Sequence, residues 1–127
     1  MKFDEYMDFT QETAIYPQAA KEVVRNAQVT TGVVLEQWLG LAYVTGKLNG
    51  EAGEIAEEVF KTMRDDKCNL SPERITRIRS ELGDLLYYMA SIASILGISL
   101  DAVAEENMTK LRSRKDRGVI QGSGSDR

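Results

Sequence analysis

The amino-acid sequence predicts an all-α protein, and three observations support that prediction. Strict alternation of polar and apolar residues, which marks a half-buried strand, is almost absent. Apolar residues instead recur at intervals of three and four, which places them on one face of a helix. The segment 85–96 is apolar nearly all round, as in a central, buried helix. We therefore expect an antiparallel helical bundle with two long core helices, completed by oligomerisation.

The first half of the chain is expected to form two short helices and a long one. The first short helix begins near Asp4 and ends before Tyr16-Pro17, because proline disfavours helix in the preceding residue. Residues 19–28 are expected to form the second. The first long helix then runs from about Val33 to Met63. Its predicted apolar stripe consists of Leu35, Trp38, Leu41 or Ala42, Leu48, Ala52, Ile55 and Val59.

The second long helix follows a polar connection over residues 64–69. Ser71 is the predicted N-cap and Pro72 the first helical residue, the positions that serine and proline favour. The helix is expected to end near Gly97. Its apolar residues are Ile75, Ile78, Leu82, Leu85, Leu86, Met89, Ile92 and Leu96.

A last helix is predicted from an N-cap at Ser99 to about Lys115. We find no repeat and no second domain, so residues 1–117 are expected to form one all-α domain. Residues 118–127 contain Gly-Ser-Gly-Ser and no periodicity, which predicts a flexible tail or a segment that orders on a ligand.

Composition excludes several kinds of active site. The chain has no histidine, which rules out Ser-His-Asp triads, His-containing zinc sites and histidine general bases. One cysteine, Cys68, allows no intramolecular disulfide and no multi-cysteine metal site. The net charge of −4 does not favour nucleic-acid binding. With no apolar run near 18 residues and no signal-peptide character at the start, we expect a cytoplasmic enzyme with no membrane partner.

Two acidic couplets are the most informative motif. Glu51-Ala-Gly-Glu54 and Glu81-Leu-Gly-Asp84 each place two carboxylates on one helix face, at the edge of an apolar stripe. Two such faces brought together would surround one point with oxygen donors, which suits Mg²⁺ or Mn²⁺ as its substitute. Glu58 lies one turn further along the same face and is a further candidate ligand.

Neighbouring glycines support the metal interpretation. Gly50, Gly53 and Gly83 each cost about 1 kcal/mol relative to alanine inside a helix, but they would let another helix or a ligand approach closely. The alternative is that the acids form solvated faces with surface salt bridges, because acidic pairs at helical spacing are common there.

The last helix carries a basic stripe. Lys110, Arg114 and Arg117, with Asn107 as a further candidate, recur at three and four spacing, and such groups suit the oxygens of a polyphosphate. The alternative is a solvated last turn in which cations interact favourably with the helix dipole.

Taken together, these motifs resemble the MazG-like branch of the all-α nucleoside triphosphate pyrophosphohydrolases. The resemblance rests on Gly50-Glu-Ala-Gly-Glu54, on Glu81-Leu-Gly-Asp84 and on the pattern from Asn107 to Arg117-Gly118, and it covers most of the chain. It implies helical bundles that assemble as homodimers or homotetramers. It also implies Mg²⁺-dependent cleavage of a nucleoside triphosphate to monophosphate and pyrophosphate. Many relatives carry a further acid where this chain has Gly50, so the number of metal ions stays open.

By position, the resemblance makes Glu51, Glu54, Glu81 and Asp84 metal ligands. It makes Lys110, Arg114 and Arg117 phosphate contacts. Our hypothesis for the mechanism is attack on the α-phosphorus by a metal-activated water, with Glu54 as the first candidate for the general base. Five aromatic residues could stack on a base, but none is singled out, so base and sugar preference stay open. The alternative function is a non-catalytic oligomeric helical bundle that binds a nucleotide or a partner protein.

Overall fold

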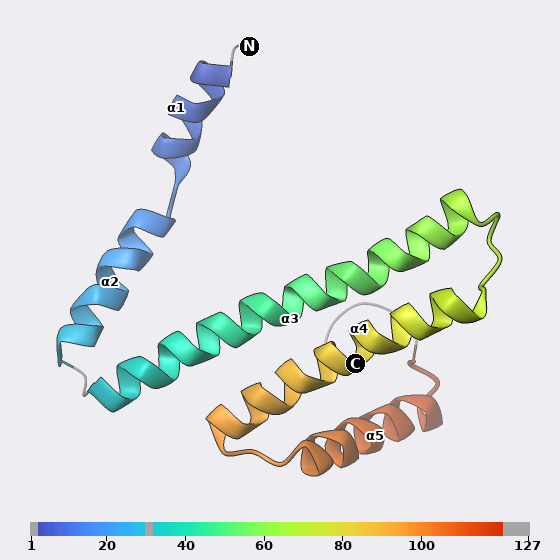
Figure 1. The fold of residues 1–127 in the computed structure, drawn as a ribbon. Helices are drawn as coiled ribbons and strands as arrows, with labels where there is room; N and C mark the ends of the chain where they lie inside the picture. The colour runs from blue at the N-terminus through green and yellow to red at the C-terminus, as the bar shows by residue number, and fades with distance from the viewer. Residues whose placement is uncertain (1–2, 30–31, 121–127) are drawn as a thin grey trace. The chain divides into compact units, whose positions relative to one another are not determined.

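The computed structural model describes residues 3–29 and 32–120, and it confirms the all-α prediction for these ranges (Figure 1). The described residues form five helices and no strand: α1 (Phe3–Thr13), α2 (Tyr16–Val29), α3 (Gly32–Asp65), α4 (Pro72–Leu96) and α5 (Leu100–Asp116). The chain divides into two compact units, Met1–Leu39 and Gly40–Arg127. Most of the predicted tail, residues 121–127, lies outside the described residues.

The first unit contains α1 and α2. Helix α1 ends at Thr13, before Tyr16-Pro17, as predicted. Helix α2 begins at Tyr16, three residues earlier than expected, because proline fits the first turn of a helix, where its missing N–H needs no partner. No residue of α1 is buried, and Phe3 and Phe9 are more than half exposed.

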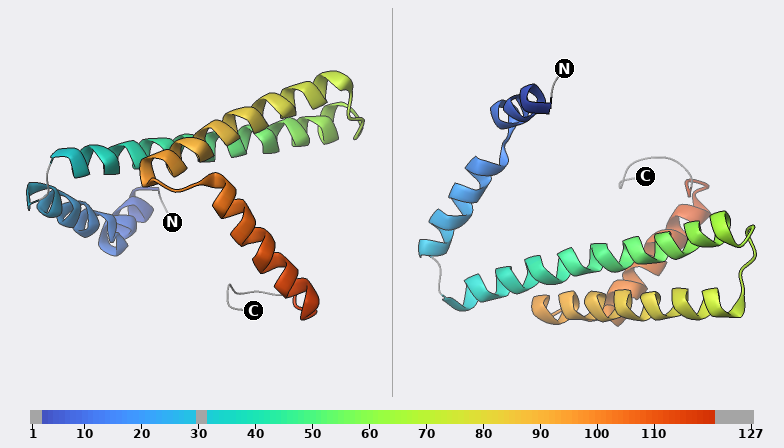
Figure 2. Two further views of the ribbon diagram at one scale, coloured as in Figure 1. Left: turned by 90° about the horizontal axis from the view of Figure 1, so that it is seen from below. Right: turned by 45° about the horizontal axis from the view of Figure 1, so that its top comes forward.

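Helices α3 and α4 lie side by side and antiparallel (Figures 1 and 2), and α4 has the predicted ends. The Oγ atom of Ser71 accepts a hydrogen bond from the Arg74 backbone N–H at 3.2 Å, and Pro72 occupies the first turn. Gly97 closes the helix with a left-handed backbone (φ 66°), from which its N–H reaches the carbonyls of Ala93 and Ser94. Helix α3 matches its predicted span within two residues at each end.

The face between α3 and α4 has a regular spacing. On each helix, a series of less exposed residues recurs at alternating intervals of three and four. This sequence spacing is typical of two helices that pack along a shared seam. We call these two series the α3–α4 seam. On α3 they are Leu41, Val44, Leu48, Glu51, Ile55, Glu58 and Thr62, and on α4 they are Arg74, Ile78, Glu81, Leu85, Tyr88, Ile92 and Ile95.

The seam corrects the predicted stripe of α3. Glu51 and Glu58 were expected on the flank of the apolar face, whereas the structure places both within the seam. Trp38 and Val59, which were assigned to the stripe, are 65% and 42% exposed. The stripe was drawn through apolar residues alone, but the face that meets α4 contains carboxylates at regular intervals.

The prediction of a buried central helix over 85–96 is wrong for the single chain. Ala93 is the one buried residue of α4, while Leu86 and Tyr87 are 61% and 66% exposed. The physical reason is that α3 covers one face of α4 and leaves much of the other apolar surface in contact with solvent. Completion of the bundle by a second copy stays a prediction.

Helix α5 begins at the predicted cap, where the Ser99 Oγ accepts a hydrogen bond from the Ala102 N–H at 3.3 Å. It ends at Asp116, and Gly118 follows with a left-handed backbone (φ 69°). The chain bends by 104° between α4 and α5. Among the described helices, none alone is long and apolar enough to cross a membrane; α4 and α5 reach that length and composition only as a bent pair.

Candidate functional site

Three predicted metal ligands meet across the α3–α4 seam. One carboxylate oxygen each from Glu51 on α3 and from Glu81 and Asp84 on α4 lies within 4.8 Å of the other two. Glu51 and Glu81 are partly buried, and Asp84 is exposed. We call these three residues the carboxylate cluster. Three of the four carboxylates of the two couplets therefore lie together, because the antiparallel pairing aligns the middle of α3 with the middle of α4.

The carboxylate cluster fits a hard divalent cation. Mg²⁺ takes oxygen ligands at about 2.0–2.1 Å in an octahedron, which places two ligands of one ion about 3–4 Å apart. The three carboxylate oxygens lie within 4.8 Å of one another, which is close to that spacing. The donors are all carboxylates, which favours Mg²⁺ or Mn²⁺ over softer metals.

The electrostatics of the cluster also favour a bound cation. Burial, followed by the charges of Glu54, Asp84 and Glu51, raises the pKa of Glu81. Unneutralised carboxylates that face one another in a partly buried place repel, and a bound cation would remove that repulsion. Glu54 is exposed and lies outside the cluster, although its charge acts on Glu81.

Glu58 is held by cations of the protein. It is buried, at 9% exposure, and its Oε2 accepts a hydrogen bond from the Arg74 Nη1 at 2.8 Å. The Lys61 Nζ donates to its Oε1 at 3.2 Å. These bonds, Arg74 first, lower the pKa of Glu58 despite its burial. The candidate ligand Glu58 is thus an ion-paired residue two turns from Glu51 and not a member of the carboxylate cluster.

Lys47 borders the cluster and was not predicted from the sequence. Its Nζ lies 3.6 Å from the Oε1 of Glu51 and 5.8 Å from the ring centre of Tyr88. The electrostatic interaction with Tyr88, and then that with Glu51, raises the pKa of Lys47. Its position four residues before Glu51 was the available signal, since such pairs meet on a helix.

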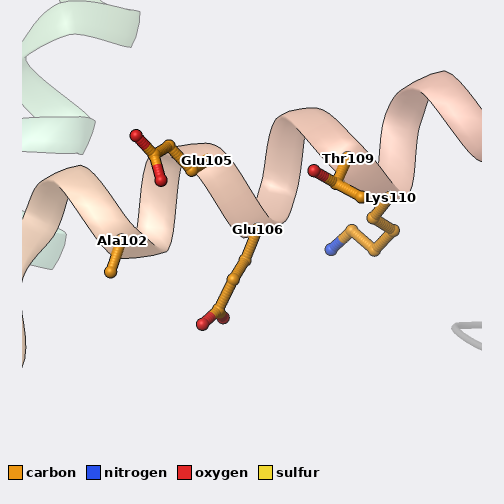
Figure 3. A pocket seen from close by; sticks show the side chains of 5 residues that line it. All are labelled: Ala102, Glu105, Glu106, Thr109 and Lys110. Atoms are coloured by element: carbon orange, nitrogen blue, oxygen red, sulfur yellow. The ribbon is translucent and has the colours of Figure 1, made fainter.

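The predicted basic stripe lies on α5. Lys110 lines a shallow hollow with Ala102, Glu105, Glu106 and Thr109, all from the same helix (Figure 3). The amino group of Lys110 extends to the same side of α5 as the carboxylate of Glu106 in that view. This hollow therefore contains no residue of the carboxylate cluster.

The other members of the stripe differ in their surroundings. Arg114 is partly buried, and Arg117 is the exposed C-cap residue of α5. Asn107 lines a different, more apolar hollow with Met108, Leu111 and Ile120 among its neighbours. The structure places the stripe on one helix, but it does not gather these four side chains around one hollow.

Aromatic residues near the seam leave the base site open. Tyr87 and Tyr88 meet edge to face, with ring centres 5.2 Å apart. Trp38, Tyr43 and Tyr87 are each more than 60% exposed. No described contact selects one of these rings as a platform for a base.

This chain is similar to known proteins over the segment that carries these residues. The sequence profile of the MazG nucleotide pyrophosphohydrolase domain matches residues 42–119. That segment contains the carboxylate cluster and the basic stripe. The Gene 37 protein of Mycobacterium phage L5 is 42% identical over 127 residues, and the match covers 100% of both chains. No solved structure matches this chain significantly.

Proposed function

This chain belongs to the family of MazG nucleotide pyrophosphohydrolases, and we propose that it is a Mg²⁺-dependent hydrolase of phosphoric anhydrides. Its reaction would cleave a ribo- or deoxyribonucleoside triphosphate to the monophosphate and pyrophosphate. The observation that carries the proposal is the convergence of Glu51, Glu81 and Asp84 from two helices. The family profile supports a nucleotide as the substrate.

In this proposal, the carboxylates have two roles: binding the metal ion and accepting a proton. Glu51, Glu81 and Asp84 would hold Mg²⁺, and Glu54, one turn from Glu51, would either complete the ligand set or accept a proton from water. Bound Mg²⁺ supplies positive charge that neutralises the triphosphate and lowers the pKa of a water molecule. Glu54 is exposed and lies outside the carboxylate cluster, which leaves its carboxylate accessible to water.

The cations of α5 are proposed to bind the leaving group. Lys110, Arg114 and Arg117 would contact the β- and γ-phosphates and offset the charge that develops on pyrophosphate. Their support is the family match, which spans them, and their three-and-four spacing. Asn107 is the weaker candidate because it lines an apolar hollow.

We propose that the active protein is a homodimer or homotetramer, with residues 1–117 as its domain. Its support is the exposed apolar surface of the single chain, where Leu82, Leu86 and Leu96 of α4 are 45%, 61% and 48% exposed. A contiguous exposed apolar surface of this kind marks a site of interaction with another chain or a ligand. Sedimentation at micromolar concentration tests the assembly, and a monomer would contradict it.

Product analysis tests the proposed activity. The purified protein is incubated with Mg²⁺ and each common ribo- and deoxyribonucleoside triphosphate, and the products are separated by chromatography. We expect monophosphate and pyrophosphate in equal amounts, with base and sugar preference read from the same panel. Glu51→Gln and Glu81→Gln should abolish turnover, whereas Glu57→Gln, a matched control at an exposed position of α3, should not. Binding of nucleotide without product would favour the non-catalytic alternative.

A further inference from the structure

We propose that Arg74 is a positioning residue that fixes the register of α3 against α4 and so assembles the carboxylate cluster. The inference rests on the proposed function, because it takes the cluster to be a metal site. Arg74 lies outside the cluster, and its side-chain hydrogen bonds go to Glu58 and Asp66. Its effect on the site would therefore pass through the packing of the two helices.

Arg74 joins three parts of the helical hairpin. Its side chain, on the first turn of α4, donates from Nη1 to the Oε2 of Glu58 on α3 at 2.8 Å. It also donates from Nε to the Oδ2 of Asp66, in the connection between the helices, at 2.7 Å. We call these three residues the Arg74 bridge. The side chains of Arg74 and Glu58 are only 14% and 12% exposed, so the pair is shielded from water on most sides.

The bridge and the cluster share one register. Glu58 follows Glu51 by seven residues on α3, and Arg74 precedes Glu81 by seven residues on α4. Seven residues are about two helical turns, or about 10.5 Å, so each residue of the bridge lies on the same face as its counterpart in the cluster. In an antiparallel pair, the alignment that brings Arg74 to Glu58 therefore also brings Glu81 to Glu51.

A slip of the two helices by one layer of the seam would break the bridge and the cluster together. If one helix slid along the other by three or four residues, Ile55 would lie opposite Arg74 or Glu81, and Ile78 would lie opposite Glu58 or Glu51. Such a slip moves Glu51 about 5 Å along the seam from its partners on α4, which is more than twice a Mg²⁺–oxygen bond. The slip also separates the shielded guanidinium of Arg74 from the carboxylate of Glu58, and a buried charge without its partner is unfavourable. A polar contact within an apolar seam is an established means of selecting register.

Binding of Mn²⁺, followed by electron paramagnetic resonance of the free ion, tests the inference without any turnover. Arg74→Met should weaken binding about tenfold or more, the usual effect of losing a residue that supports metal ligands. Arg74→Lys keeps the charge but not the two-pronged contact, so its affinity should fall between those of Arg74→Met and the original chain. Arg64→Met is the matched control, because Arg64 pairs with its sequence neighbour Asp65 and its side chain is 74% exposed. Its affinity should change by less than about twofold.

The direction of the change in Mn²⁺ affinity distinguishes a positioning role of Arg74 from a purely electrostatic one. Removing a positive charge about two turns from an acidic cluster would strengthen cation binding if Arg74 acted only through its field. Weaker binding by folded Arg74→Met, with the control unchanged, supports the proposal; equal or tighter binding overturns it. If circular dichroism shows that Arg74→Met does not fold, Arg74→Lys decides, and an unchanged affinity overturns the proposal.

Failure of the proposed function is distinguishable from failure of this inference. If the original chain binds Mn²⁺ and Arg74→Met weakens that binding, but no nucleotide yields product, the register proposal stands and the activity is overturned. Product formation with unchanged metal binding in Arg74→Met overturns the register proposal alone. A chain that binds no Mn²⁺ overturns both, because there is then no metal site to position.

Discussion

Replacing Gly53 with alanine should stabilise the protein, and the structure sets the size of the gain. Gly53 lies within α3, where alanine is more favourable than glycine by about 1 kcal/mol. A Cβ atom built at Gly53 meets nothing within 4 Å, so neither a clash nor extra burial changes that figure. Unfolding entropy of about 2.1 cal/mol/K per residue over 127 residues converts the gain into a Tm about 4 °C higher.

Gly97→Ala is the matched control and should act in the opposite direction. Space is open there too, but the backbone is left-handed (φ 66°), which costs a residue with a Cβ about 1–2 kcal/mol. The reduced freedom of the unfolded chain offsets part of that cost, so Tm should fall by about 4 °C.

Both changes are measured by thermal unfolding followed by circular dichroism, in buffer without metal. A lower Tm for Gly53→Ala would refute the reasoning, because it would mean that another chain or a ligand packs against α3 at that glycine. An unchanged or higher Tm for Gly97→Ala would refute the assigned helix end.

Four further outcomes are expected. Ser71→Ala removes the cap of α4 and should cost about 1 kcal/mol, seen as a lower Tm. Glu81→Gln should raise the Tm of the metal-free protein at pH 7, because the raised pKa of Glu81 means that its charge opposes folding. That gain should shrink as the pH falls through this pKa, in melts recorded with a chelator, and a destabilised variant at pH 7 would contradict the sign. Added Mg²⁺ should raise the Tm of the original chain in a concentration-dependent way that a chelator reverses. Lys110→Met should lower kcat/KM for the preferred nucleotide by about tenfold or more, the value of a hydrogen bond to a charged group, while Lys115→Met on the same helix should not.

The helix ends were predictable because they depend on local chemistry. Ser71 and Pro72 at the start of α4, Gly97 at its end and Ser99 before α5 each act on the backbone within a few residues. A cap or a left-handed turn needs no information about the rest of the fold. The start of α2 was missed by three residues because Pro17 was treated as a boundary and not as part of a first turn.

The composition of the seam was harder to predict. Apolar spacing assigned Ala52 and Val59 to the buried face of α3, whereas Glu51 and Glu58 lie in the seam. The alternating three-and-four interval that passes through both glutamates was present in the sequence, but a search for apolar residues alone does not detect it. The partner of Arg74 depends on the register of two helices, which no single-helix pattern determines.

Three of the four carboxylates of the two couplets lie together, and α4 is less covered in the single chain than its apolar sequence predicted. Glu51, Glu81 and Asp84 meet because a hairpin of two long helices aligns their midpoints. Leu86 and Tyr87 remain exposed because one chain supplies only one covering helix. Surfaces that another chain completes cannot be located from the periodicity of one chain, since buried core and interface residues follow the same pattern.

The most direct test of the central claim is hydrolysis of the preferred nucleoside triphosphate in ¹⁸O-labelled water with Mg²⁺, with the label located by ³¹P NMR. Attack at the α-phosphorus predicts ¹⁸O in the monophosphate and none in pyrophosphate. Label in pyrophosphate or in inorganic phosphate would show attack at the β- or γ-phosphorus and would contradict the proposed reaction.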